Sequence, residues 1–65
     1  MNALVEFPVM LDAKGPTPVL INLNLVIKFY PNAANAAQTI VEFSNGTRNI
    51  VAADMEAVKG MLQRP

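Results

Sequence analysis

TIVEFSNGTRNIV, residues 39–51, is the stretch of sequence that decides the fold. Asn45 and Gly46 lie between two runs rich in β-branched and aromatic residues, the pattern of a β-hairpin with a tight turn. A type I′ turn needs positive φ at both central positions, which Asn and Gly adopt at the lowest cost. We therefore predict a hairpin centred on Asn45 and Gly46.

The length of this turn decides which residues face each other. A two-residue loop gives the opposed pairs Ser44–Thr47, Phe43–Arg48, Glu42–Asn49, Val41–Ile50 and Ile40–Val51. A three-residue loop with a bulge instead pairs Glu42 with Arg48 and leaves Val41 opposite Asn49. Because the two-residue loop makes more apolar cross-strand pairs, we predict that register.

Residues 4–11 alternate between an apolar face and a second face that contains Glu6 and Pro8, which predicts a strand. Pro8 has no N–H, so we expect this strand at an edge of the sheet or with a bulge at Pro8. Residues 12–16 have turn chemistry, and Pro16 and Pro18 should delay the next strand until about Val19.

Residues 19–30 are too long for one ordinary strand. We predict a break at Asn22 and Asn24, whose side chains can bond to the local backbone, and hence strands near residues 19–22 and 25–30. Residues 31–38 have no large apolar side chain and are short for a stable helix, so we expect a mobile loop there, or one helical turn.

A short helix is predicted over residues 55–63. Asp54 is a good N-cap, and Glu56 in the first turn suits the helix dipole. One apolar stripe runs along this helix: Met55, Val58, Met61 and Leu62. Gly60 weakens helix propensity, so the helix should depend on packing.

These elements predict one domain over residues 1–65, mainly β with one C-terminal helix, in the order β-β-β-β-β-α. The expected architecture is a small bent sheet or an SH3/Sm-like partly open barrel. The predicted core consists of Val5, Phe7, Val9, Ile21, Leu25, Ile27, Val41, Phe43, Ile50, Val58, Met61 and Leu62.

The composition predicts self-association. A chain of 65 residues is near the lower limit for folding alone, and with no Cys and no His it lacks the usual disulfide or zinc support. A 52% apolar content with only five acidic and five basic residues leaves apolar area that is hard to bury in one protomer. We expect a homo-oligomer, a dimer or a ring, whose contact uses spare apolar faces together with an open strand edge, either near residues 26–30 or on the far side of the hairpin. A compact monomer is the alternative.

We expect a cytoplasmic protein without a membrane partner. Glu6 and Pro8 interrupt the N-terminal apolar run, which argues against a signal peptide, and no apolar run is long enough to span a membrane.

The segment INLNLVIKF, residues 21–29, resembles the corresponding segment of the small bacterial flagellar FlbD-type family. The similarity continues through Thr39-Ile40-Val41, Asn45-Gly46, Ile50-Val51, Asp54 and Val58. The chain is more loosely similar to the C-terminal half of LytTR-type DNA-binding domains. The resemblances imply a shared β-rich fold and, if function is shared as well, a flagellar or DNA-binding role. The chain departs from both families in its Pro-containing first strand and in having few basic residues after Gly46.

Catalysis has few candidate residues. Ser44 is the only serine and has no His or Cys beside it in the sequence, and the carboxylates lie on separate elements. The three glycines are widely separated, which excludes a phosphate-binding loop. We predict a non-enzymatic protein without cofactor or metal.

The predicted function is a structural or protein-interaction module that binds itself or another protein. The alternative is an Sm-like or LytTR-like nucleic-acid-binding module. Its candidate contact residues are Lys28, Tyr30, Asn32, Arg48 and Asn49. A net charge of +0 and a pI of about 6.0 argue against this alternative, because phosphate contacts supply much of the affinity for nucleic acids.

Overall fold

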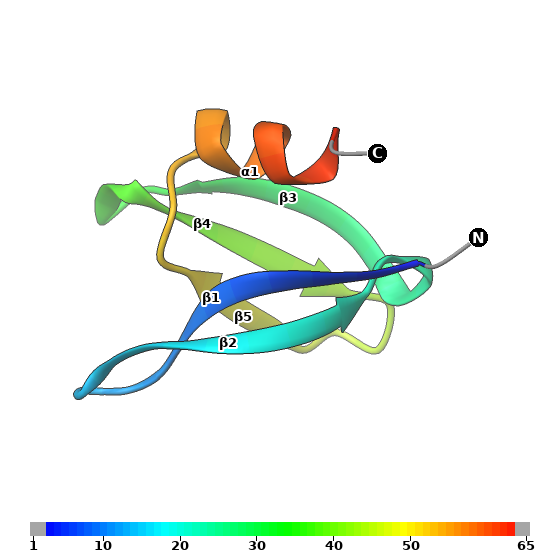
Figure 1. The fold of residues 1–65 in the computed structure, drawn as a ribbon, viewed down its shortest axis with the longest axis horizontal. Helices are drawn as coiled ribbons and strands as arrows, with labels where there is room; N and C mark the ends of the chain where they lie inside the picture. Colours follow the sequence, from blue (N-terminus) through cyan, green and yellow to red (C-terminus); the bar gives the residue numbers. More distant parts are fainter. Residues whose placement is uncertain (1–2, 64–65) are drawn as a thin grey trace.

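The computed structural model describes residues 3–63, which form five antiparallel strands in one open sheet, followed by one α-helix (Figure 1). The elements are β1 (Leu4–Asp12), β2 (Gly15–Asn22), a 3₁₀ helix (Leu23–Leu25), β3 (Val26–Asn32), β4 (Asn35–Phe43), β5 (Arg48–Val51) and α1 (Met55–Leu62). The strands lie in the order β2-β1-β5-β4-β3. The predicted fold class is confirmed.

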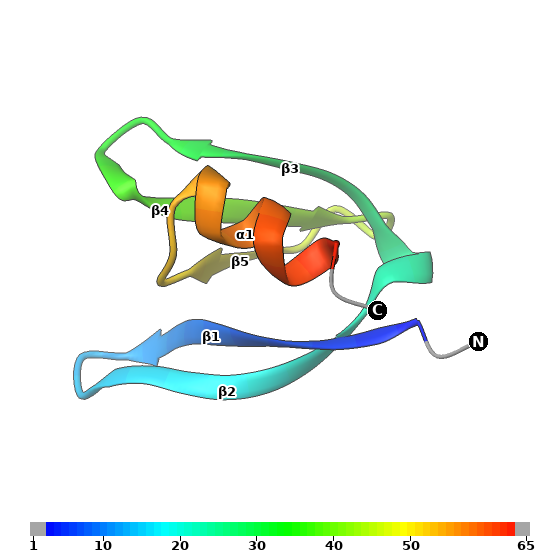
Figure 2. The same ribbon diagram turned by 45° about the horizontal axis from the view of Figure 1, so that its top comes forward.

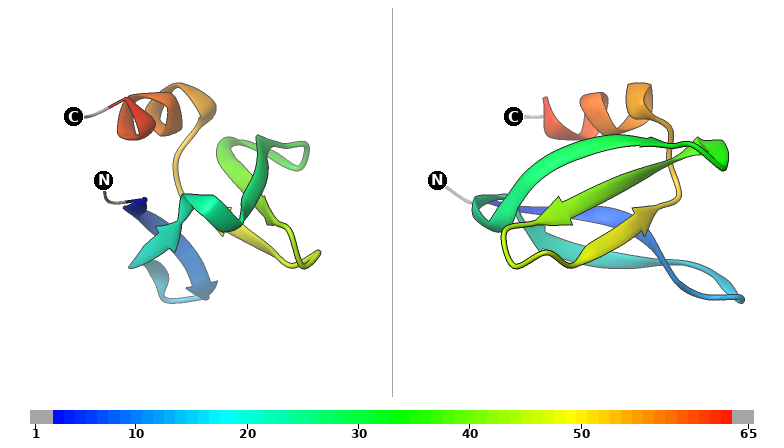
Figure 3. Two further views of the ribbon diagram at one scale, coloured as in Figure 1. Left: turned by 90° about the vertical axis from the view of Figure 1, so that its right-hand side faces the viewer. Right: turned by 180° about the vertical axis from the view of Figure 1, so that it is seen from behind.

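The sheet narrows where β1 meets β5. Val9 and Val51 are the one residue pair across this seam in residues 3–63, and the Ala52 amide donates to the Pro8 carbonyl at 2.7 Å. The backbone nitrogen and carbonyl of a residue in an antiparallel strand point to the same side, so the Pro8 nitrogen also faces β5, where it has no hydrogen to donate. The ladder stops there, and the β1–β2 hairpin diverges from the other three strands (Figure 3).

The prediction for Pro8 is therefore wrong. β1 lies inside the sheet, and its pairing with β2 is irregular between Met10 and Asp12, not at Pro8. Pro8 is tolerated in an inner strand because it faces Pro18 in a pair that exchanges no hydrogen bonds.

β2 also begins well before Val19, its predicted start. The Leu23 amide donates to the Ala3 carbonyl at 2.9 Å, and bonded and non-bonded pairs alternate along an antiparallel ladder. By this alternation, Pro16 and Pro18 fall at non-bonded positions. They remove no hydrogen bond from the β1–β2 ladder, so they do not delay the strand.

The predicted break between β2 and β3 is confirmed. The Asn22 side chain accepts a hydrogen bond from the Asn24 amide at 3.0 Å and caps the 3₁₀ helix. This local bond competes with strand pairing and turns the chain from β2 into β3.

The predicted loop over residues 31–38 is wrong. β3 continues to Asn32, and β4 begins at Asn35 after a two-residue turn. The side-chain oxygen of Asn32 accepts a hydrogen bond from the Ala34 amide, and the side-chain oxygen of Asn35 accepts one from the Ala37 amide, both at 3.0 Å. These bonds shape the turn, and the pairing of β3 with β4 does not require large apolar side chains there.

The predicted register of the central hairpin is also wrong. The loop has three residues: the Phe43 amide donates to the Thr47 carbonyl, and the Gly46 amide donates to the Phe43 carbonyl, both at 2.9 Å. Gly46 has a φ of +89°, whereas Asn45 does not have positive φ, so the turn is not type I′. Glu42 therefore faces Arg48, and Val41 faces Asn49.

The changed register brings Val51 into the core, where it pairs with the buried Thr39. The fully or nearly buried apolar side chains in residues 3–63 are Phe7, Val9, Ile21, Val41, Val51 and Val58. Of the predicted core, Val5, Phe43 and Met61 are partly buried, whereas Leu25, Ile27, Ile50 and Leu62 are exposed. The one-residue shift moves Ile50 to the outer face, and the 3₁₀ helix with the following bulge does the same for Leu25 and Ile27.

α1 lies over the concave side of the sheet and packs against β4 and β1 (Figure 2). The Asp54 carboxylate accepts from the Ala57 amide at 2.9 Å, which confirms the predicted N-cap. Val58 is the buried residue of the helix. The buried Thr39 hydroxyl donates to the Ala53 carbonyl at 2.8 Å and ties β4 to the segment that leads into α1.

Candidate interaction surfaces

The outer face of β3, β4 and β5 consists of two cross-strand rows. We define the β3–β5 outer face as Lys28, Tyr30, Ile40, Glu42, Arg48 and Ile50. Lys28, Glu42 and Arg48 form a charged row across the three strands, and Tyr30, Ile40 and Ile50 form an apolar row beside it. Ile27 is the extra residue of a bulge in β3 and is also exposed.

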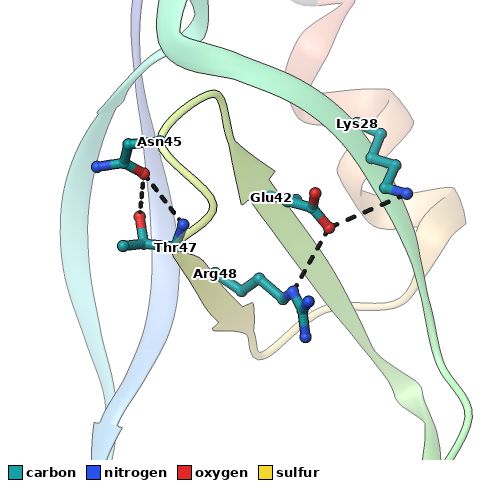
Figure 4. Close-up of polar contacts among 5 residues, drawn as sticks. All are labelled: Lys28, Glu42, Asn45, Thr47 and Arg48. Atoms are coloured by element: carbon teal, nitrogen blue, oxygen red, sulfur yellow. Dashed lines mark hydrogen bonds and ion pairs between the residues drawn. The ribbon is translucent and has the colours of Figure 1, made fainter.

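Glu42 lies between the two cations of the charged row (Figure 4). Its carboxylate oxygen is 3.4 Å from Arg48 Nε and 4.0 Å from Lys28 Nζ. The Glu42 side chain is only 18% exposed, whereas those of Lys28 and Arg48 are 58% and 62% exposed. The anion thus lies beneath the cations, and the solvent meets mainly positive groups.

The structure brings together three of the five residues predicted to contact nucleic acid. Lys28, Tyr30 and Arg48 share the outer face, and Lys28 Nζ lies 5.3 Å from the centre of the Tyr30 ring. Asn49 faces the buried Val41, on the opposite side of the sheet. Asn32 is at the far end of β3, where its side-chain amide donates to the Gln38 side chain at 3.0 Å.

The β1–β2 outer face has a different composition. We define it as Glu6, Pro8, Met10, Pro16, Pro18 and Leu20, with Leu4 at its margin. Glu6 faces Leu20, Pro8 faces Pro18 and Met10 faces Pro16. Leu20 is 62% exposed, and Glu6 has no ion-pair partner within residues 3–63. An exposed apolar face around one carboxylate is unusual for a surface that contacts only water.

Sequence reasoning did not single out Glu6 or Glu42 for these surfaces. The alternative three-residue loop contained the signal for Glu42, because only that register places Glu42 opposite Arg48. The signal for Glu6 was its position as the one charge on an otherwise apolar outer row of β1.

A shallow hollow of about 320 Å³ opens beside the Asn45–Gly46 turn. Leu25 and Phe43 provide its apolar lining, and Ser44, Asn45 and Thr47 provide its polar lining. The Asn45 side-chain oxygen accepts hydrogen bonds from the Thr47 amide at 3.0 Å and from the Thr47 hydroxyl at 2.7 Å (Figure 4). These contacts stabilise the turn. None of the five residues that line the hollow has an acidic or a basic side chain.

The acidic side chains described in residues 3–63 do not gather in groups of three that could hold a metal ion. Over the same residues, no helix has the length and apolar character needed to cross a membrane. Comparisons with protein-family models, with curated proteins and with solved structures found no match to this chain. The resemblances to FlbD-type and LytTR-type proteins therefore stay predictions.

Proposed function

We propose that this chain is a non-enzymatic protein-interaction module that associates with copies of itself. The observation that carries the proposal is the β1–β2 outer face, where exposed apolar side chains surround the single charge of Glu6. β1 and β2 are thus apolar on both faces, a pattern typical of strands that are covered on both sides. The core covers one face, and a protein partner would cover the other.

The proposed architecture for this module is a partly open barrel of the SH3/Sm-like kind. Its support is the return of the last strand to the first: β5 pairs with β1 at Val51 and Val9, while β2 and β3 are joined through the 3₁₀ helix. Phe7 and Phe29 meet across the interior, with ring centroids 5.8 Å apart.

Multi-angle light scattering across a dilution series tests the proposal. The expected result is a mass that rises above that of one chain as concentration increases, because the small apolar face belongs to the class of weak, reversible interfaces. The mass of a single chain at every concentration would contradict it.

A nucleic-acid-binding module is the second candidate, because Lys28, Tyr30 and Arg48 lie together on one exposed sheet face. An aromatic ring next to cations is the arrangement that stacks and neutralises single-stranded nucleic acid. Glu42 offsets part of the positive charge, so the expected affinity is low.

Titration of fluorescently labelled single-stranded RNA and DNA at low and high salt tests this candidate. A true site binds at low salt and weakens steeply as salt rises, because bound phosphates release counterions. A Tyr30→Ala variant should weaken binding, whereas Lys59→Ala on α1 is the matched surface control. No binding at low salt would eliminate this candidate.

A further inference from the structure

Self-association through the strand edges is limited by proline. The outward-pointing positions of β2 include Pro16 and Pro18, which have no N–H to donate. The Phe43–Thr47 bond fixes which residues of β4 bond to β5 and, by alternation, which bond to β3. The backbone groups of Phe29 and Pro31 then point away from β4, toward the open edge of the sheet. Pro31 therefore also removes a donor from this edge. Strand edges with so few donors are poor templates for pairing with another strand, which leaves the sheet faces as the stronger contact surfaces.

The charge of Glu6 decides which faces fit together. If two copies joined through their β1–β2 outer faces, two Glu6 carboxylates would enter one apolar contact without a cation between them. Like charges that are brought together and desolvated in a contact oppose association. This face therefore does not suit contact with its own copy.

The β3–β5 outer face complements the β1–β2 outer face in charge. Arg48 Nε lies 3.4 Å from the Glu42 carboxylate, and the Arg48 side chain is 62% exposed, so a guanidinium with several N–H donors can be reached by a partner. Beside this charged row lie Ile40 and Ile50. Glu6 likewise lies in the row next to Pro8 and Pro18.

The spacing of the rows allows both contacts at once. Neighbouring rows on one face of a sheet are two residues apart along the strand, which is about 7 Å. A carboxylate meeting the Lys28–Arg48 row therefore brings the adjacent proline row over Ile40 and Ile50. One placement satisfies the charge and buries the apolar side chains.

We propose that the β1–β2 outer face of one copy docks on the β3–β5 outer face of the next, with Glu6 directed toward Arg48 and Lys28. The inference rests on the proposed self-association and specifies its surface. Because the two faces differ, the contact is head-to-tail, and it produces a ring if the rotation closes or a filament if it does not.

Charge reversal on each face tests this contact. Glu6→Lys and Arg48→Glu, each alone, should weaken association about tenfold or more, seen in light scattering as a loss of mass at concentrations where the wild type associates. An equimolar mixture should regain mass, because each variant then meets opposite charge on its partner. Glu56→Lys on α1, outside both faces, is the control and should leave the mass unchanged.

The outcomes separate the two proposals. Wild-type protein that stays a single chain at every concentration would overturn self-association itself. Association that survives both reversals, or that is not regained in the mixture, would overturn only the head-to-tail contact. Circular dichroism and thermal melting check that the variants fold; if Arg48→Glu does not, Lys28→Glu makes the same charge change in the same row.

Discussion

Gly46 is the residue on which the central hairpin most depends. Its φ of +89° is a conformation that residues with a side chain rarely adopt, and a Cβ added there would have no heavy atom within 4 Å. Any effect of a substitution therefore comes from backbone strain and not from crowding.

We expect Gly46→Val to lower the free energy of unfolding by about 1–2 kcal/mol, which is roughly 5–15 °C in Tm for a domain of this size. Gly60→Ala is the matched control: Gly60 lies inside α1 with open space around it, so Ala should raise stability by up to about 1 kcal/mol. Thermal melts of both variants check this. If Gly46→Val melts like the wild type, the three-residue loop is wrong.

At the scale of the element, α1 is held by its N-cap and by one buried side chain. The helix has only eight residues, too few to be stable on propensity alone. Asp54 satisfies the Ala57 amide, and Val58 inserts into the core between β4 and β1. Loss of the cap should therefore weaken the cover over the concave side of the sheet.

We expect Asp54→Ala to cost about 1 kcal/mol of stability, because it leaves a first-turn amide without its partner. Asp54→Asn keeps a capping oxygen and should retain most of the stability. Urea denaturation followed by far-UV circular dichroism measures both variants. Equal loss in the two would point to the charge of Asp54 and not to its hydrogen bond.

For the whole molecule, the arrangement of prolines decides how an open sheet of five strands avoids uncontrolled edge pairing. Pro16 and Pro18 face outward on β2, and Pro31 faces outward on β3. Each removes a donor from an open edge without removing a hydrogen bond from the sheet.

We expect the double variant Pro16→Thr, Pro18→Thr to aggregate faster than the wild type, because it adds two outward N–H groups to an exposed strand. Thioflavin T fluorescence and light scattering at matched concentrations measure this. Pro8→Thr is the control, since its nitrogen faces the β1–β5 seam and not the edge. Aggregation at the wild-type rate in the double variant would contradict the protective role.

The sequence by itself determined the elements whose signals are local. The Asn22 break, the Asp54 cap, the short helix and the order of the elements along the chain all follow from side chains that bond within a few residues or repeat with a clear period. Lys28 and Tyr30, two residues apart in one strand, share a face by strand alternation alone, whereas Arg48 joins them only in the observed register, which pairs it with Glu42 and not with Phe43.

Only the tertiary structure decided the register of the hairpin and the direction of each proline. Cross-strand pairs favoured Val41 opposite Ile50, but the core against Phe7 and Val58 needs Val51 inside, and a single bulge residue at Gly46 shifts every side chain after it to the other face. In the same way, whether a proline disrupts or protects a sheet depends on which neighbour its nitrogen faces. For Pro8 that neighbour is β5, a strand distant in sequence, so local pattern cannot specify it.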